Sequence, residues 1–314
     1  MKLADGYIAY IVNPKSGASS CRLTGQRFRK YLAERGFEVR ISQTTSLPHA
    51  CEIAVAAAED NCCAMVAVAG GDGTVREAAH GLVASNKPLL IVPCGTENLL
   101  ANELGFDANP QTVIDVFEEG YTKDLDLGNA NGRCFTSIAG FGFDGRVVER
   151  VSEQRKGHID YTDYFWPIWR TFWDYKFDKM QVTVDGCKIS DDRCMVFVGN
   201  ISKYALGLGI LKQADFSDGL LDVCIYRCAS RIRLIKHSLM TILKQHIRSK
   251  DVIYRQGKKI IITSDISGVQ TQIDGDPGPG LPVEIEVIPK AVKIMVPKNA
   301  KPAGIRTRII RALG

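Results

Sequence analysis

The chain has 314 residues, of which 45% are hydrophobic and 24% charged, and it carries a formal net charge of +5. This composition excludes intrinsic disorder, collagen and coiled coils, and the length predicts about two domains. Because 40 Lys and Arg residues barely outnumber 35 Asp and Glu residues, the charge predicts no nucleic-acid partner.

The N-terminus and the cysteines bear on the cellular compartment. Asp5 and Gly6 interrupt the apolar stretch that a signal peptide would need. No apolar run approaches the roughly 18–20 residues of a membrane-spanning helix. We therefore expect a cytoplasmic protein whose membrane contact is peripheral, at the inner face. Its ten cysteines are expected to be free and mostly buried, and its five histidines structural.

The first part of the chain alternates between two periodicities. Short apolar runs at residues 7–12, 37–41, 64–69 and 88–92 are separated by segments of helical spacing. This order predicts an α/β domain over residues 1–128 with a mostly parallel sheet. Ligands of such sheets bind outside the carboxyl ends of the strands, so the loops there are the candidates for a site.

The remainder, residues 129–297, predicts antiparallel β structure, a sandwich or a barrel. Turn residues such as Asp185-Gly186 separate closely spaced strand-like runs. These runs lie at residues 181–184, 195–198, 221–225, 259–263, 271–273 and 283–287. Two segments have helical character, residues 146–173 and 231–246. Residues 298–314 are expected to pack back on the first domain.

A glycine-rich loop, Gly70-Gly71-Asp72-Gly73-Thr74, follows the apolar run at 64–69 and precedes a predicted helix. Glycines let the backbone approach a ligand closely, and the start of a helix offers N–H groups and partial positive charge to a phosphate. Asp72 would repel that phosphate unless it binds Mg²⁺ or deprotonates a hydroxyl. The alternative is an aspartate that only stabilises the turn.

Two further loops of this kind follow other apolar runs. They are Asn13-Pro14-Lys15-Ser16-Gly17 and Gly95-Thr96-Glu97-Asn98. The three loops are expected to converge at one edge of the parallel sheet. None matches the Walker A pattern and no GxGxxG motif is present, so neither a P-loop enzyme nor a dehydrogenase is supported.

The motifs NPKSG, GGDGTVRE, GTEN and IDGD occur in this order. With them the chain resembles the diacylglycerol kinase catalytic domain family, which includes bacterial lipid kinases and sphingosine and ceramide kinases. The resemblance implies an ATP-dependent lipid kinase with an α/β nucleotide domain like that of NAD kinases and diacylglycerol kinases. It also implies a C-terminal antiparallel β-sandwich domain and an active site in the cleft between the two.

The resemblance also implies roles for individual residues. The nucleotide contacts of the family fall on Asn13, Pro14, Lys15, Ser16, Gly17, Thr44, Gly70, Gly71, Asp72, Gly73, Thr74, Val75, Arg76 and Thr96. Its structural Mg²⁺ site falls on Asp215, Asp218 and the carbonyl of Leu220, where oxygen ligands suit a hard cation. A plain type I turn before the strand at 221–225 is the alternative.

The proton acceptor of the family lies in a DGE motif, which Asp274-Gly275-Asp276 matches here with a shorter last residue. A general base must lie about 2.6–3.2 Å from the hydroxyl that it deprotonates. We therefore expect Asp276 to be the base, with backbone or water compensating its reach and Asp274 supporting or substituting. Arg76, where bacterial members often have Asn, either adds charge to a phosphate or is a solvated helix-surface residue.

The expected reaction is transfer of the γ-phosphoryl group of ATP to a lipid hydroxyl, diacylglycerol or a related alcohol, with Mg²⁺ bound partly through Asp72. One alternative is a soluble-substrate kinase of the NAD kinase type, which shares a GGDG loop. Another is a nucleotide- or lipid-binding module without turnover. The identity of the lipid and the oligomeric state, a homodimer included, stay open.

Two segments are candidates for membrane contact. All three tryptophans lie in an aromatic cluster, with Trp166, Trp169 and Trp173 at helical spacing. The cluster consists of Tyr161, Tyr164, Phe165, Trp166, Trp169, Phe172, Trp173, Tyr175 and Phe177. It is either lipid-contacting or part of the core. The tail at 301–314 is basic, with apolar residues at i, i+4, i+8, which is typical of a weak anchor for anionic membranes, or else a frayed or docked terminus.

Overall fold

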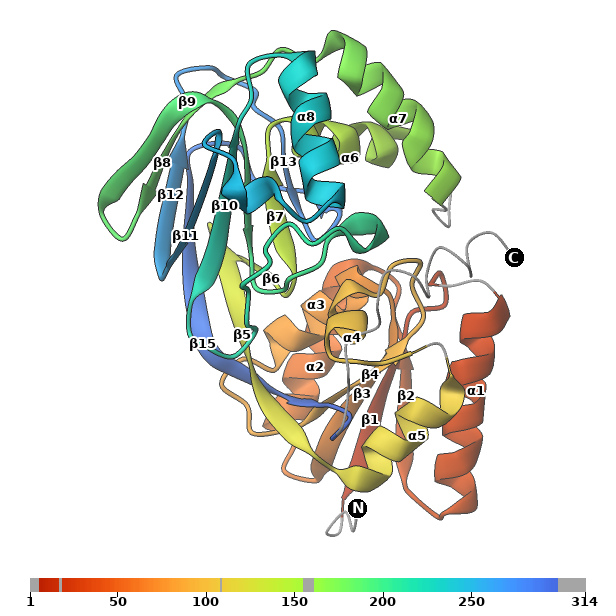
Figure 1. The fold of residues 1–314 in the computed structure, drawn as a ribbon. Helices are drawn as coiled ribbons and strands as arrows, with labels where there is room; N and C mark the ends of the chain where they lie inside the picture. Colours follow the sequence, from red (N-terminus) through yellow and green to blue (C-terminus); the bar gives the residue numbers. More distant parts are fainter. Residues whose placement is uncertain (1–5, 17–18, 108, 155–160, 299–314) are drawn as a thin grey trace. The chain divides into compact units, whose positions relative to one another are not determined.

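The computed structural model describes residues 6–16, 19–107, 109–154 and 161–298 (Figure 1). The chain forms two compact units, one of Met1–Leu125 with Lys290–Gly314 and one of Asp126–Pro289. The sequence analysis placed the boundaries after residues 128 and 297. The chain passes between the units within two strands, β5 (Thr122–Ala130) and β15 (Val283–Met295). No break in composition marks either crossing, because each lies inside a regular strand.

The first unit is built on a parallel sheet. Its strand order is β15-β4-β3-β1-β2, and every neighbouring pair is parallel. The strands are β1 (Tyr7–Val12), β2 (Val39–Gln43), β3 (Cys63–Gly70) and β4 (Leu89–Pro93). In β3, seven of eight residues are buried, as expected of a parallel strand covered on both faces.

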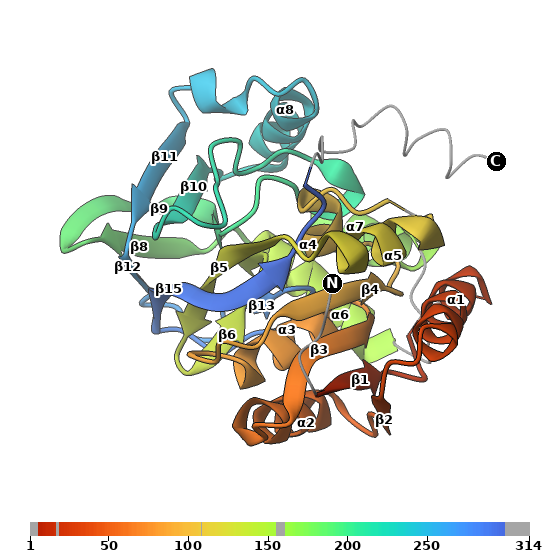
Figure 2. The same ribbon diagram turned by 90° about the horizontal axis from the view of Figure 1, so that it is seen from below.

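Helices cover both faces of this sheet. They are α1 (Ser19–Glu34), α2 (Leu47–Glu59), α3 (Asp72–Gly81), α4 (Leu99–Glu103) and α5 (Pro110–Glu119). Figure 2 shows α2 and α3 on one side of the strands and α1 and α5 on the other. This arrangement follows from the strand order. The connection through α1 runs from β1 to β2, and the connection through α2 runs in the opposite direction across the sheet, from β2 to β3. Because both crossovers are right-handed, they lie on opposite faces. The predicted α/β domain is confirmed.

The second unit is an antiparallel β-sandwich. One sheet has the order β14-β13-β7-β9-β10-β11, and the other joins β9, β8, β12 and β15. The strands not yet named are β6 (Arg133–Phe135), β7 (Ile138–Phe141), β8 (Lys179–Val184), β9 (Cys187–Gly199), β10 (Leu221–Arg227), β11 (Val252–Gly257), β12 (Lys259–Thr263), β13 (Thr271–Ile273) and β14 (Asp276–Pro277). The long strand β9 belongs to both sheets, pairing with β8 through its first half and with β7 and β10 through its second.

The core of the second unit follows from alternation along its strands. In β15 the side chains of Val283 and Ile285 are buried, whereas Glu284 and Glu286 point outward to an ion pair with Lys259. Inward-facing residues of both sheets form one apolar cluster. The predicted β-sandwich is therefore confirmed.

The helices of the second unit differ from the sequence prediction. Within the segment expected to be helical at 146–173, the structure describes the helices α6 (Phe143–Gln154) and α7 (Tyr161–Asp174). Residues 155–160 lie outside the described residues. The second helix, α8 (Arg231–Ile242), is shorter than predicted because Lys244 has a φ of 57°, which no α-helix continues. Two 3₁₀ turns occur at Ala205–Gly207 and His246–Arg248.

Among the residues that the structure describes, no helix combines the length and the apolar character needed to cross a membrane. The described cysteines are free thiols, and most are buried as expected. Cys62 and Cys187 are exposed, and Cys51 is half-buried.

Candidate active site

Three loops of the first unit meet at the carboxyl ends of β1, β3 and β4, as the sequence predicts. The side-chain amide of Asn13, after β1, donates to the hydroxyl of Thr74 at 2.8 Å. The backbone N–H of Gly71, after β3, donates to the hydroxyl of Ser16 at 3.4 Å. These bonds hold the NPKSG and GGDG loops together at the start of α3, where helix N–H groups and partial positive charge favour a phosphate.

The third loop touches the glycine loop backbone to backbone. A Cβ placed on Gly71 would lie 3.2 Å from the Cα of Gly95, and one on Gly95 would lie 2.7 Å from the Cα of Gly71. Any side chain at Gly95 would therefore push the two loops apart. Glycine is required here for a close approach of backbone to backbone.

Asn98 is a contributor that the sequence analysis did not single out as a site residue. It has a left-handed φ of 49°, its side-chain oxygen accepts from the N–H of Gly95 at 2.6 Å, and its amide donates to the Gly95 carbonyl at 2.8 Å. Both bonds close the GTEN loop on itself. The signal available in the sequence was that asparagine tolerates this conformation better than other residues with a side chain.

Other predicted nucleotide contacts occupy the same edge of the sheet. Thr44 follows β2 and is nearly buried, with its N–H donating to Val12 at 2.9 Å. Pro14 and Lys15 are exposed in the loop after β1, and the Lys15 N–H donates to the side chain of Asn13. Thr96 lies in the loop after β4. Gly17 lies outside the described residues.

The residues that open α3 fall into two classes. Asp72 and Gly73 form its first turn and are partly exposed. Val75 and Arg76 are only 2% and 1% exposed, so neither presents its side chain to solvent. The guanidinium of Arg76 pairs with Glu77 at 2.9 Å. The alternative that Arg76 is a solvated surface residue was therefore wrong.

In the second unit, the Asp274-Gly275-Asp276 motif is a two-residue hairpin between β13 and β14. Asp274 and Gly275 have φ values of 48° and 81°, the positive pair that a type I′ turn requires. Asp276 is the first residue of the returning strand and pairs with Ile273. The motif thus fixes the backbone from which the Asp276 side chain projects.

The carboxylate of Asp274 is fully engaged in holding this hairpin. It accepts from the N–H groups of Thr136, Ser137 and Ile138 at 2.9–3.0 Å, and from the Thr136 hydroxyl at 3.2 Å. Both oxygens are therefore used by buried donors. This geometry fits a supporting role for Asp274 and argues against the alternative that it substitutes as the base.

Asp276 itself is less enclosed, with a side chain 17% exposed. Arg133 approaches its carboxylate at 3.9 Å and also donates to the carbonyl of Pro277. The sequence analysis missed Arg133, because nothing in the linear sequence connects it with a motif far along the chain.

A second carboxylate near this hairpin was also missed. Asp144, in the first turn of α6, accepts from the hydroxyl of Tyr204 at 3.0 Å and from the side-chain amide of Gln272. Burial raises its pKa to about 6, although part of the residue is accessible. The side chain of Gln272 also accepts from the N–H of Gly275 at 2.9 Å, which links Asp144 to the hairpin.

The predicted structural Mg²⁺ site lies in the loop before β10. One oxygen of Asp215 accepts from Ser217, and one oxygen of Asp218 accepts from the N–H of Leu220 at 2.9 Å. The buried Asp126 anchors the loop by accepting from the N–H of Gly219 at 2.6 Å. Burial, with the charges of Asp218 and Asp215 adding to it, raises the pKa of Asp222.

These donors fit a hard cation. Asp215, Asp218 and the Leu220 carbonyl supply oxygen atoms only, and the crowding of acidic groups around buried Asp222 is what a bound cation would relieve. The site chemistry therefore divides between two units. The first unit offers three joined loops with Asp72 at the start of α3, and the second offers Asp276 beside a hydrogen-bonded turn and a loop of oxygen donors.

Two family models match the chain. The diacylglycerol kinase catalytic domain matches residues 8–130. The YegS C-terminal NAD kinase beta sandwich-like domain matches residues 137–296. Together they cover the sheet and loops of the first unit and most of the second.

Two curated proteins that are similar to the chain over nearly its whole length are named diacylglycerol kinases. A diacylglycerol kinase of Mycobacterium tuberculosis is 30% identical over 302 residues, which is 94% of this chain and 96% of that protein. The diacylglycerol kinase of Bacillus subtilis is 26% identical, over 92% and 96% of the two chains.

Solved structures share the fold. A crystal structure of a diacylglycerol kinase from Bacillus anthracis strain Sterne has a TM-score of 0.70 at 20% identity, covering 94% and 98% of the two chains. Another structure from that organism reaches 0.76 at 23% identity, covering 93% and 98%.

Proposed function

Since the chain belongs to the diacylglycerol kinase family, we propose that it transfers the γ-phosphoryl group of ATP to a hydroxyl group of diacylglycerol or a related lipid alcohol. Membership makes the chain a lipid kinase, a phosphotransferase with an alcohol as acceptor. The observation that carries the proposal is the joining of three phosphate-type loops through the Asn13–Thr74 bond, the Ser16–Gly71 bond and the Gly71–Gly95 contact.

The loops of the first unit would hold the nucleotide. Backbone N–H groups at the start of α3 and the hydroxyls of Ser16 and Thr74 suit the phosphate oxygens, and Lys15 lies exposed in the adjoining loop. Asp72 would bind the Mg²⁺ that accompanies ATP, and this ion supplies neutralisation of the negative charge on the phosphates. Such positioning and charge stabilisation account for most of the rate in phosphoryl transfer.

In the proposed step, the lipid hydroxyl oxygen forms a bond to the γ-phosphorus, the bond from that phosphorus to the bridging oxygen breaks, and ADP leaves. The hydroxyl proton passes to the carboxylate of Asp276. The Asp274-Gly275 turn supports this assignment, because the buried bonds of Asp274 fix the backbone from which the Asp276 side chain projects, and Arg133 approaches the Asp276 carboxylate at 3.9 Å. No covalent enzyme intermediate is needed.

The loop at Asp215, Asp218 and Leu220 would hold a second Mg²⁺ with a structural role. Its oxygen donors and the anchoring of Gly219 by Asp126 support this. The ion would stabilise the loop that leads into β10 by offsetting the negative charge around Asp222.

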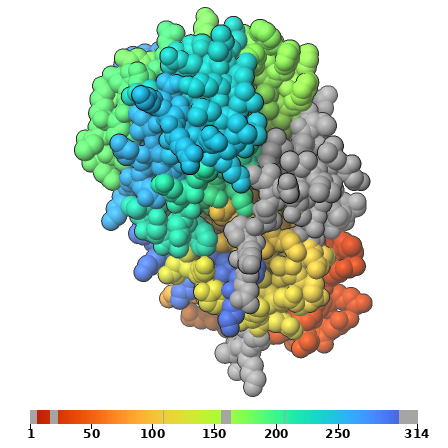
Figure 3. Space-filling model, viewed as in Figure 1, coloured from red at the N-terminus to blue at the C-terminus, as the bar shows by residue number. Residues whose placement is uncertain are grey.

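A specific face of the second unit would bring the kinase to its substrate. Of the fifteen large apolar side chains exposed among the described residues, ten lie on α7, α8 or the residue after α8. They are Phe165, Trp166, Ile168, Trp169, Trp173, Ile232, Ile235, Leu239, Ile242 and Leu243. We call these side chains the α7–α8 face (Figure 3, light green and cyan).

Contacts and charge support an anionic bilayer as the partner of the α7–α8 face. The guanidinium of Arg231, at the start of α8, donates to the Phe172 carbonyl at 2.9 Å and lies 5.7 Å from the ring centre of Trp173, which joins the two helices. The α8 sequence contains Arg231, Arg233 and Lys236 and no acidic residue. Basic side chains beside exposed tryptophan and isoleucine are typical of interfacial helices. A cytoplasmic protein bound at the inner membrane face is therefore proposed.

The proposed catalysis is tested by transfer of labelled γ-phosphate from ATP to a lipid panel in mixed micelles with Mg²⁺. The wild type is compared with Asp72→Ala and with Asp115→Ala, which removes an exposed carboxylate elsewhere in the first unit. A labelled lipid that disappears only with Asp72→Ala supports the proposal and identifies the acceptor.

Two outcomes of the same assay would overturn the proposal. Label appearing on NAD and on no lipid would favour a kinase of the NAD kinase type, to whose β-sandwich the second unit is similar. ATP binding without transfer to any acceptor would favour a module that binds nucleotide or lipid without turnover.

The α7–α8 face is tested with vesicles of phosphatidylglycerol and phosphatidylcholine. Ile232 is 80% exposed, and we expect Ile232→Ser to weaken co-sedimentation roughly tenfold, the effect of one large apolar side chain. Ile41→Ser, on the first unit and 43% exposed, is the control. Brominated lipid is expected to quench the tryptophans of α7. Equal binding of both variants, or absence of quenching, would reject this face.

A further inference from the structure

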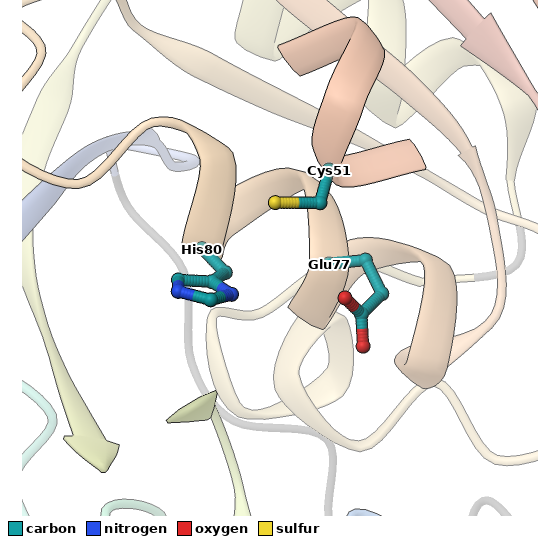
Figure 4. Close-up of side chains that lie close together, drawn as sticks. All are labelled: Cys51, Glu77 and His80. Carbon is teal, nitrogen blue, oxygen red and sulfur yellow. The ribbon is translucent and has the colours of Figure 1, made fainter. Parts of the chain in front are cut away.

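Three metal-ligating side chains from two helices of the first unit lie together, away from the glycine loop. Cys51 comes from α2, and Glu77 and His80 come from α3 (Figure 4). The sulfur, a carboxylate oxygen and an imidazole nitrogen all lie within 4.8 Å of one another. Among the residues that the structure describes, this is the one group of three or more His, Cys, Asp or Glu side chains with such spacing.

Close packing of the two helices creates this cluster. A Cβ placed on Gly81 of α3 would lie 2.6 Å from the carbonyl oxygen of Cys51 and 2.7 Å from the Cβ of Ala54, so glycine allows the helices to touch there. Glu77 and His80 are three residues apart on α3 and therefore share a face. All three side chains are mounted on regular helices, which hold ligands more precisely than loops do.

The accessibility of the cluster suits exchange with solvent. Cys51 and Glu77 are half-buried and His80 is exposed. One oxygen of Glu77 accepts from two nitrogens of Arg76 at 2.9 and 3.1 Å, which fixes the orientation of the carboxylate. A carboxylate oriented by a second residue is the arrangement that supports metal ligands in proteins.

The donor set selects the metal. A thiolate and an imidazole exclude Mg²⁺ and Ca²⁺, which prefer oxygen ligands only. Zn²⁺ accepts sulfur, nitrogen and carboxylate oxygen at about 2.0–2.3 Å, so ligand atoms around it lie about 3.4–3.6 Å apart in a tetrahedron. Zn²⁺ binding would therefore require the side chains to rotate until the three atoms, now within 4.8 Å of one another, reach that spacing.

We propose that Cys51, Glu77 and His80 form a Zn²⁺ site between α2 and α3, with the fourth position open to water or an exogenous ligand. The site is distinct from the Asp72 and Asp215–Asp218 positions, which offer oxygen donors. Zn²⁺ would link α2 to α3, the helix that carries the glycine loop at its start. The proposal does not depend on kinase activity.

The test uses the full chain and measures metal binding directly. Zn²⁺ titration by calorimetry is expected to give one site per chain. With Co²⁺ in place of Zn²⁺, a thiolate-to-metal charge-transfer band and the visible bands of four-coordinate Co²⁺ are expected. Cys51→Ser and His80→Gln should each weaken Zn²⁺ binding at least about 100-fold, more than the loss of an outer-shell partner of a ligand.

Matched variants guard against unspecific thiol and imidazole binding. Cys62→Ser removes an exposed thiol, and His49→Gln removes a partly exposed imidazole of the same unit. Both should retain wild-type affinity, and circular dichroism should show that all four variants are folded. Absence of a tight site in the wild type would overturn the proposal, as would equal affinity of the Cys51→Ser and Cys62→Ser proteins.

Discussion

Two hairpins of the β-sandwich carry the same dipeptide. Asp185-Gly186 joins β8 to β9, and Asp274-Gly275 joins β13 to β14, with φ values of 47° and 80° in the first and 48° and 81° in the second. In both, the aspartate carboxylate accepts N–H groups from a separate segment of the chain. Asp185 binds Lys258 and Lys259, whereas Asp274 binds residues 136–138.

The hairpins differ in their surroundings. Of the residues that donate to Asp185, Lys258 is exposed and Lys259 is partly exposed, whereas the residues that donate to Asp274 are fully buried. Asp185-Gly186 is followed by exposed Cys187, and Asp274-Gly275 by the candidate base Asp276. The dipeptide thus specifies a turn in both places, and tertiary burial together with the next residue decides whether the turn supports a site.

The largest difference between the two hairpins is expected when the residue that follows each turn is replaced. Asp276→Ala is expected to lower phosphoryl transfer roughly 1,000-fold, within the range for loss of a general base. The free energy of unfolding should change by less than about 1 kcal/mol, because the ion pair with Arg133 is long and partly solvated. Cys187→Ala should change neither quantity. Transfer rates and urea unfolding check this, and an active Asp276→Ala protein would remove Asp276 from the mechanism.

Replacing the aspartate of each turn should destabilise both hairpins unequally. Asp274→Ala removes the carboxylate that accepts from three buried N–H groups. We expect this change to lower the free energy of unfolding by roughly 3–5 kcal/mol. Asp185→Ala should cost only about 1 kcal/mol, because water can reach the freed donors. Urea unfolding of both variants gives the comparison. Equal losses would mean that burial does not distinguish the two turns.

A pH effect on stability is expected at Asp144, which is linked to the Asp274-Gly275 hairpin through Gln272. The pKa of Asp144 is raised to about 6 in the folded protein, above the value near 3.9 of an unfolded aspartate. The folded state therefore binds this proton more tightly, and the corresponding stability is complete below about pH 4 and is lost as the pH rises through 6.

The variant Asp144→Asn does not ionise and should lack this dependence. We subtract the free energy of unfolding of the wild type from that of Asp144→Asn. This difference is expected to increase by roughly 1–3 kcal/mol between pH 4.5 and pH 8, because only the wild type loses stability over that range. Urea unfolding at both pH values measures this difference. A difference that stays constant between the two pH values would contradict the raised pKa of Asp144.

The smallest losses of stability are expected at the glycines of the two turns, and they should be equal. A Cβ on Gly186 or Gly275 meets no atom within 4 Å, so Gly→Ala at either position costs only the positive φ, roughly 1–2 kcal/mol. Thermal unfolding of the two variants should show matching decreases. A much larger loss at Gly275 would show that the site hairpin lacks room that the structure assigns to it.

Much of the fold followed from local patterns. The strand positions of the first unit, the convergence of the three loops and the turn at Asp185-Gly186 were all predictable, because apolar periodicity and turn chemistry are properties of short segments. The same holds for Gly71 and Thr74, which stand at the end of one strand and the start of one helix.

The remaining features depend on residues far apart in sequence. The approach of Arg133 to Asp276, the burial of Arg76 and the meeting of Cys51 with His80 arise from packing between elements. Periodicity cannot reveal such contacts.

The last residues of β15 have a consequence for synthesis of the chain. They complete the first sheet beside β4, where Ile294 pairs with Leu89, although the whole second unit is encoded between them. At about 5–20 residues per second, a ribosome needs on the order of ten seconds or more to reach them after finishing α5. During that interval the edge of β4 has no neighbour, while the contiguous second unit can begin to fold. Chains stopped before Lys290 would keep this open apolar edge, and such edges pair readily with other chains.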